Sequence, residues 1–248
     1  MRNIRIMIEY DGTDFIGWQI QKSGRSVQAV VKAEIDKLLQ ENVNLIGAGR
    51  TDSGVHARGQ VANFKTESGR ELIIIYKALN NFLPRDVIIR KIDEVPLEFN
   101  SRYDAIERRY RYYISTERIS LYRDYYLHCY YNLNRDILTQ CAEFIKTKLN
   151  FRSFCYANAD VKHHNCEIHE SRWIFDDKKI IFEVAANRFL HGMVRSLVGT
   201  MLDVSRGYIS LEQFMEIFDK EDRRAATKAA PAKGLVLEEV VYRDNLRF

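Results

Sequence analysis

The chain has 248 residues, of which 46% are hydrophobic and 29% charged, and its formal net charge is +4. This length fits one large domain or two of medium size, and the composition is ordinary for a soluble globular protein. Three prolines and the lack of any low-complexity tract exclude long disordered linkers. We see no secretory signal, no apolar run near the roughly 18 residues that span a bilayer, and no disulfide-scaffold spacing of the cysteines, so we expect a cytoplasmic protein.

The first half of the chain alternates strands and helices. Period-two alternation indicates strands, and apolar spacing after a residue suited to an N-cap indicates helices. We predict, in chain order, a strand over residues 4–10, a helix from Ser26 to Leu39, a strand around residues 60–64, a helix from Glu71 to Phe82 that ends before Pro84, and a strand over residues 86–92.

The second half continues the mixture. We predict a strand over residues 110–115, a helix from Asn134 to about Leu149, a hairpin of residues 171–175 and 180–185, a helix from about Arg188 to Val204, a helix capped by Ser210 with Gln213, and a closing strand over Leu235–Tyr242. Intermixed strands and helices indicate an α+β protein. We divide it into an N-terminal half, residues 1–105, and a C-terminal half, residues 106–248.

Residues 47–56, with the sequence GAGRTDSGVH, form a glycine-rich loop with one carboxylate. Glycines allow a tight, exposed backbone that comes close to a ligand. Asp52 is therefore a candidate nucleophile or base, with the charge of Arg50 close by. The alternative is a structural turn in which Asp52 bonds its own backbone.

Two further segments carry positive charge. Arg188, His191, Arg195 and Gly199 are spaced to share one face of a helix, where an arginine can pair with a carboxylate and keep it ionised. Between Arg102 and Arg123, arginines alternate with tyrosines, a pattern suited to phosphate pairing and base stacking. In both cases the alternative is a solvated face beside an apolar core.

Histidines and cysteines gather loosely in one region: Cys155, His163, His164, Cys166 and His169. Their spacing matches no closed zinc module, and a buried cysteine often serves only as a small hydrophobe. No phosphate-binding Walker loop, dinucleotide fingerprint or metalloprotease helix is present in the sequence. We therefore expect no metal and no cofactor.

Taken together, the motifs resemble those of the bacterial tRNA pseudouridine synthase A family, over nearly the whole chain. The matching segments are YDGTDFIGWQ at residues 10–19, GRTDSGVH at residues 49–56, RRYRY at residues 108–112, NRFLHGMVR at residues 187–195 and APAKGL at residues 230–235. Ser53 stands where the family usually has alanine. Residues 151–154 and 165–168 also depart from the family pattern, and at the second place a basic contact to RNA can be missing.

The resemblance implies a role for each matched residue. Asp52 would be the nucleophile that attacks a flipped-out uridine, at C1′ of the sugar or C6 of the base. Tyr110 would stack on the base and remove the C5 proton, and Arg195 would pair with Asp52. We expect RNA contacts from Arg50, Arg108, Tyr110, Arg111 and Arg188.

The resemblance also implies the fold, the substrate and the assembly. We expect a pseudouridine synthase fold, with two α+β halves around a central antiparallel sheet and a basic cleft. The substrate would be uridine at positions 38–40 of the tRNA anticodon stem-loop, and the protein would act as a homodimer without a membrane partner. The rival interpretations are a noncatalytic RNA-binding protein, a synthase for another RNA, and an aspartate-dependent hydrolase.

Overall fold

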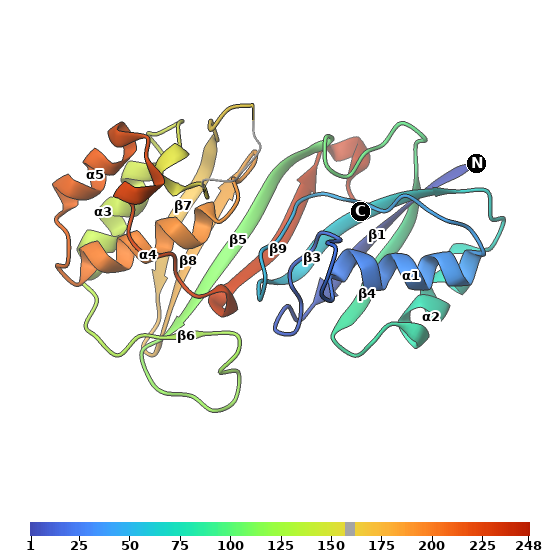
Figure 1. The fold of residues 1–248 in the computed structure, drawn as a ribbon, viewed down its shortest axis with the longest axis horizontal. Coiled ribbons are helices and arrows are strands. Elements are labelled where there is room, and N and C mark those ends of the chain that lie inside the picture. The colour runs from blue at the N-terminus through green and yellow to red at the C-terminus, as the bar shows by residue number, and fades with distance from the viewer. Residues whose placement is uncertain (157–161) are drawn as a thin grey trace. The chain divides into compact units, whose positions relative to one another are not determined.

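The computed structural model of the protein describes residues 1–156 and 162–248, and it divides into two compact units. The first unit comprises Met1–Glu107 with Val236–Phe248, and the second comprises Arg108–Leu235. Each unit combines strands with helices, which confirms the α+β class (Figure 1). The C-terminal residues from Val236 onward belong with the N-terminal unit, whereas we expected them in the C-terminal half, residues 106–248.

The strands of the first unit explain this difference. They are β1 (Arg2–Tyr10), β2 (Ile46–Gly47), β3 (His56–Thr66), β4 (Val87–Val95) and β9 (Leu235–Tyr242). β1 lies between β3 and β4 and is antiparallel to both, with Ile6 opposite Ala62 and Ile92. β9 pairs with β3 in parallel, so this last strand adds to the first unit. The central sheet, which was expected to be antiparallel, therefore contains a parallel pair in this unit and is mixed.

Two helices of the first unit pack on the sheet and on each other: α1 (Val27–Leu39) and α2 (Leu72–Phe82) (Figure 1). Both match their predicted bounds to within a residue. The Ser26 side chain accepts a hydrogen bond from the backbone N–H of Ala29, as an N-cap serine should. The stripe Val27, Val31, Ile35 and Leu39 is buried, and it faces a core that contains Ile4, Ile6 and Ile8 of β1.

The sheet of the second unit is formed by β5 (Ala105–Ser115), β6 (Leu127–His128), β7 (Ile168–Phe175) and β8 (Lys179–Ala186). β8 lies between β5 and β7 and is antiparallel to both, so the predicted hairpin is confirmed. The short strand β6 returns to pair in parallel with the end of β5. The two-residue strands β2 and β6 were not predicted.

Three helices of this unit are α3 (Arg135–Ile145), α4 (Met193–Ser205) and α5 (Leu211–Lys220). Short 3-10 turns of the unit cover Arg152–Phe154, Arg223–Ala225 and Ala232–Gly234, and another in the first unit covers Asp244–Leu246. The Asn134 cap and the capping box of Ser210 with Gln213 are both confirmed. The prediction that α4 starts at Arg188 is wrong. Residues 188–190 have no regular structure, and the N-cap residue Gly192 has the left-handed φ of +71°, so α4 begins only at Met193.

Aromatic side chains form the core beneath α3 and α5. Phe154 packs on Phe218 with ring centroids 4.7 Å apart, and Phe144, Phe151 and Phe214 complete the cluster. The Ser153 hydroxyl donates a hydrogen bond to the backbone oxygen of Ile217 at 2.6 Å. At residues 151–154, where the sequence departs from the family pattern, Phe151, Ser153 and Phe154 are thus buried in a packed core, whereas Arg152 is exposed. None of the helices in the described ranges is long and apolar enough to cross a bilayer.

Candidate active site

Asp52 lies in the loop between β2 and β3. The backbone N–H of Val55 donates to the carbonyl oxygen of Asp52 at 3.1 Å, and Gly54, the third residue of this turn, has φ +77°. These features define a type II turn, in which the third residue is normally glycine. Asp52 is half-buried at the start of the turn, so it remains partly accessible to solvent.

Residues 10–19 form a cradle under this loop. The Tyr10 hydroxyl lies 2.7 Å from the Thr51 hydroxyl, and the Trp18 N–H donates to the Thr51 carbonyl oxygen at 3.1 Å. The Phe15 carbonyl oxygen accepts hydrogen bonds from the Gly54 N–H and the Ser53 hydroxyl, both at 3.2 Å. The cradle therefore holds the residues on both sides of Asp52.

Two glycines make this close approach possible. A Cβ atom on Gly17, which has φ +107°, would lie 2.5 Å from the Thr51 carbonyl oxygen. A Cβ atom on Gly12 would lie 2.1 Å from the Val55 carbonyl oxygen. Any side chain at either position would push the loop away. Residues 10–19 therefore support the backbone of the loop that carries Asp52. This relationship was not predicted from the sequence.

Two polar side chains complete the surroundings of the loop. Arg50 is exposed, and its Nε donates to the Gln19 side-chain oxygen at 3.1 Å, which holds the guanidinium beside the cradle. His56 is buried at the start of β3, and its Nδ1 accepts a hydrogen bond from the Gly12 N–H at 3.0 Å. Nδ1 also lies 3.1 Å from an Asp11 oxygen, a contact that would be favourable only with the proton on Nδ1. In the tautomer that the Gly12 bond requires, this contact is no ion pair.

Tyr110 lies in β5 of the second unit and is 7% exposed. It stands opposite Val184 of β8, and its ring meets the Phe189 ring edge to face, with centroids 5.2 Å apart. The strand and the aromatic neighbour together fix the plane of the Tyr110 ring. A rigid ring of this kind suits stacking on a base.

Arg195 lies in the first turn of α4. Its Nε donates to the Ala230 carbonyl oxygen at 2.9 Å, and the Ala230 N–H donates to the Arg195 carbonyl oxygen at 2.9 Å. A Cβ atom on Gly199, one helical turn later, would lie 2.1 Å from the Lys228 carbonyl oxygen. The segment 228–230 therefore lies directly on α4, and it orients the Arg195 guanidinium.

The other predicted RNA contacts have different settings. Arg188 and His191 precede α4, so the predicted helix face shared with Arg195 and Gly199 is wrong; Arg188 instead has an Nη1 atom 3.5 Å from Nε2 of His163. Arg108 donates to the Asn187 carbonyl oxygen at 2.8 Å.

Arg111 has a partner on the neighbouring strand. It donates to the buried carboxylate of Glu183 at 2.5 Å, and Arg172 of β7 donates to the other oxygen at 2.5 Å. Burial alone would raise the pKa of Glu183, but the hydrogen bonds from the two arginines outweigh it and hold the pKa below its usual range. The Glu183 partner was not predicted.

The cysteines of the Cys/His region are buried free thiols. Burial raises the pKa of Cys166 to about 12, so this thiol stays protonated at neutral pH. Within residues 1–156 and 162–248, no three His, Cys, Asp or Glu side chains are grouped so that they could hold a metal ion.

Comparison with known proteins agrees with the motifs. The sequence model of a family described as tRNA pseudouridine synthase matches residues 6–104 and 148–243, which include Asp52 and Arg195, whereas Tyr110 lies between the matched segments. Curated relatives named tRNA pseudouridine synthase A include one from Caldicellulosiruptor bescii, 39% identical over 98% of this chain and 100% of its own. Another, from Bacteroides thetaiotaomicron, is 35% identical over 99% of this chain and 93% of its own.

These matches extend over both units. The fold and the motif-bearing segments define an isomerase that acts on a nucleoside within RNA. The chain belongs to the tRNA pseudouridine synthase A family.

Proposed function

We propose that the protein isomerises uridine to pseudouridine in tRNA, with Asp52 as the nucleophile. The observation that carries this proposal is the cradle of residues 10–19, which holds the backbone on both sides of Asp52 through Thr51, Ser53 and Gly54. An ordinary surface turn needs no such support. A nucleophile that must meet one atom of a flipped nucleoside does need it, because a displacement of about 1 Å costs on the order of 100-fold in rate.

The reaction rearranges bonds and adds no atoms. The N1–C1′ bond breaks, the base rotates, a C5–C1′ bond forms, the C5 proton leaves, and N1 gains a proton. Asp52 would form a transient covalent bond, at C1′ or at C6, which divides the rearrangement into easier steps. A nucleophile, a base and a charge partner therefore suffice in principle, and the balance of the reaction requires no second substrate.

Tyr110 and Arg195 take the remaining roles in this proposal. Tyr110 would stack on the base and remove the C5 proton, since its ring is held rigidly by β8 and Phe189. Arg195 would pair with the Asp52 carboxylate and orient it. Extrusion of the uridine costs a few kcal/mol, which stacking and phosphate contacts offset.

We also propose the finer substrate and the assembly that the family resemblance implies. The target is uridine at positions 38–40 of the anticodon stem-loop, with RNA contacts from Arg50, Arg108, Arg111 and Arg188, and the active form is a cytoplasmic homodimer. Sedimentation at micromolar and nanomolar concentrations checks the assembly. Full activity from a species that is monomeric at every active concentration would contradict the dimer.

The decisive experiment is the incubation of purified protein with unmodified tRNA, followed by carbodiimide treatment and primer extension. We expect stops in the anticodon stem-loop with the wild type and none with Asp52→Asn. Asp177→Asn is the matched control, because Asp177 is an exposed carboxylate in the turn between β7 and β8. Modification by Asp52→Asn at the wild-type level would overturn the assigned nucleophile. Tight tRNA binding by the wild type without any modification would favour a noncatalytic RNA-binding protein.

A further inference from the structure

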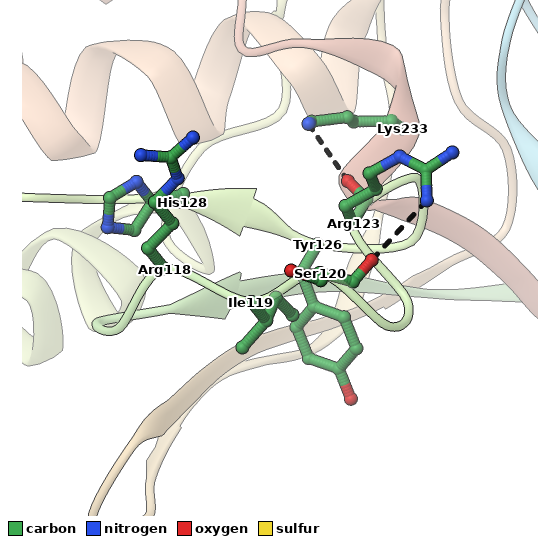
Figure 2. Close-up of a pocket in the computed structure, with 7 residues that line it drawn as sticks. All are labelled: Arg118, Ile119, Ser120, Arg123, Tyr126, His128 and Lys233. Carbon is green, nitrogen blue, oxygen red and sulfur yellow. Dashed lines mark hydrogen bonds between the residues drawn. The ribbon is translucent and has the colours of Figure 1, made fainter.

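The second unit contains a positively charged pocket that the proposed catalytic roles do not use. Its volume is about 430 Å³, within the range of about 300–1,000 Å³ that is usual for ligand sites. Figure 2 shows its seven lining residues: Arg118, Ile119, Ser120, Arg123, Tyr126, His128 and Lys233. All except Lys233 lie in residues 105–147, which the family model does not match.

The chain builds this pocket by folding a loop back onto the sheet. β5 ends at Ser115, and β6 returns beside it, with Leu127 opposite Ile114 and His128 opposite Ser115. The Cys129 N–H then donates to the Ser115 carbonyl oxygen at 2.9 Å. Residues 116–126 are therefore a loop with both ends fixed on the same strand, and this loop forms most of the pocket wall.

Lys233 reaches the pocket from the APAKGL segment, which is also fixed to β5. The Tyr112 hydroxyl donates to the Pro231 carbonyl oxygen at 2.8 Å, and a Cβ atom on Gly234 would lie 2.7 Å from the Tyr112 ring. The Lys233 ammonium donates to the Arg123 carbonyl oxygen at 2.9 Å (Figure 2). The lysine thus ties the loop to the segment and brings its charge to the pocket.

The charges of the lining favour an anion. Arg118, Arg123 and Lys233 have cationic side chains, the His128 ring adds an N–H group, and none of the seven lining residues is acidic. Of the nearest carboxylates along the chain, Glu117 pairs with Lys178 at 3.0 Å, and Asp124 lies 3.5 Å from Arg123 and offsets part of its charge, so Arg118 and Lys233 supply most of the positive charge. Guanidinium groups match the geometry of phosphate oxygens, so a phosphate fits this lining.

Residues near the pocket also present aromatic rings to solvent. Tyr122 of the loop is 69% exposed, and Tyr130, two residues after β6, is 80% exposed. Exposed aromatic rings beside a cationic pocket are typical of RNA binding, in which phosphates pair with the cations and bases stack on the rings. A site for free inorganic phosphate would need the cations but not the rings.

The pocket lies close along the chain to the Arg195 site. Lys233 is three residues after Ala230, which accepts the Arg195 hydrogen bond, and three residues span at most about 11 Å. We propose that this pocket binds a phosphodiester group of the substrate RNA and so holds the strand next to Arg195. This inference rests on the proposed function, because it takes RNA to be the substrate.

The test is the salt dependence of RNA binding by Arg118 variants. Arg118 is exposed, so its substitution should leave the fold intact, and thermal unfolding checks this. Binding of unmodified tRNA is measured in an Asp52→Asn background, in which the RNA is not converted. For Arg118→Gln we expect affinity to fall three- to tenfold at low salt and the slope of log K against log salt to fall by about 0.7–0.9, the value for one lost phosphate contact. Arg118→Lys should restore most of both, and Arg118→Glu should lose more.

Arg85→Gln is the matched control, because it removes one exposed arginine from the loop between α2 and β4. An equal loss in this control, or wild-type affinity and slope in both Arg118→Gln and Arg118→Glu, would overturn the inference. A pocket that binds only free phosphate would also overturn the inference. In that case inorganic phosphate, added at constant ionic strength, would raise the Tm of the wild type but not that of Arg118→Glu. The tRNA affinity would stay unchanged in both Arg118→Gln and Arg118→Glu.

The two proposals can fail separately. Binding is measured without turnover. A wild type that binds tRNA but forms no pseudouridine would therefore contradict the proposed function, whereas the phosphate pocket would still be tested by the slope of log K against log salt. A wild type that forms pseudouridine, with no change in slope in the Arg118 variants, would remove only the pocket.

Discussion

The hydroxyl groups of Tyr10 and Thr51 lie 2.7 Å apart in the buried interior of the first unit. Thr51 directly precedes Asp52, the proposed nucleophile. Burial raises the pKa of Tyr10, so the phenol stays neutral and can donate or accept this hydrogen bond. The contact joins the end of β1 to the loop that carries Asp52. It makes the position of the nucleophile depend on a residue that takes no part in the chemistry.

Tyr10→Phe should therefore lower both stability and activity. The variant leaves the Thr51 hydroxyl without this buried partner, which costs about 1–2 kcal/mol and lowers Tm by about 3–6 °C in a chain of this size. We expect kcat to fall on the order of tenfold at temperatures where the variant remains folded, because the loop loses one of its supports. Thermal unfolding and single-turnover pseudouridine formation measure the two effects. Tyr208→Phe, at an exposed tyrosine, is the control and should change neither.

Gly17→Ala tests the close approach between residues 10–19 and the loop that carries Asp52. The new Cβ atom would lie 2.5 Å from the Thr51 carbonyl oxygen, at a φ of +107° that alanine rarely adopts. We expect a loss of about 2–3 kcal/mol in the free energy of unfolding, together with a large loss of kcat. Gly69→Ala is the matched control, since nothing lies within 4 Å of its Cβ position and it should stay within about 0.5 kcal/mol of the wild type. Equal behaviour of the two variants would refute the close approach.

The Glu183 carboxylate predicts a pH dependence of stability. Its pKa is lowered in the folded protein, so its contribution is fully present above the unfolded-state pKa of about 4.3 and is lost as pH falls through the lower, folded-state value. Glu183→Gln should cost about 2–3 kcal/mol near neutral pH, because Arg111 and Arg172 lose their charged partner. The difference between wild type and variant should shrink below about pH 4. Urea unfolding from pH 3 to pH 7 measures it, and a difference that is constant with pH would contradict the assignment.

Features that depend on contacts between residues close in the sequence could be predicted, whereas features that depend on contacts between distant residues could not. Ser26 and Asn134 cap their helices through bonds to residues two or three positions away, so the sequence near each helix start was sufficient. Apolar spacing continues through Leu190 and Met193, so the pattern placed the start of α4 too early. The true start depends on the left-handed backbone conformation of Gly192, which the spacing does not indicate.

Longer-range relationships were not visible. The pairing of β9 with β3 joins residues about 180 positions apart, and the buried Glu183 partner of Arg111 lies across a strand pair. For the site, the motifs pointed to Asp52, Tyr110 and Arg195, but neither motif alone indicates that residues 10–19 support residues 51–55. Such contacts are set by tertiary packing, which a local pattern does not encode.

Gly199→Ala separates helix propensity from packing. In the middle of α4, alanine should by propensity stabilise the helix by about 1 kcal/mol relative to glycine. The structure predicts the opposite sign, because the new Cβ atom would lie 2.1 Å from the Lys228 carbonyl oxygen and 2.9 Å from the Ala230 nitrogen. The segment 228–230 would have to move away from α4, and the hydrogen bond between Arg195 and Ala230 would be lost with it. We expect a lower Tm and a fall in kcat larger than the change in KM, measured by thermal unfolding and steady-state pseudouridine formation. A more stable variant with unchanged kcat would show that this segment does not orient Arg195.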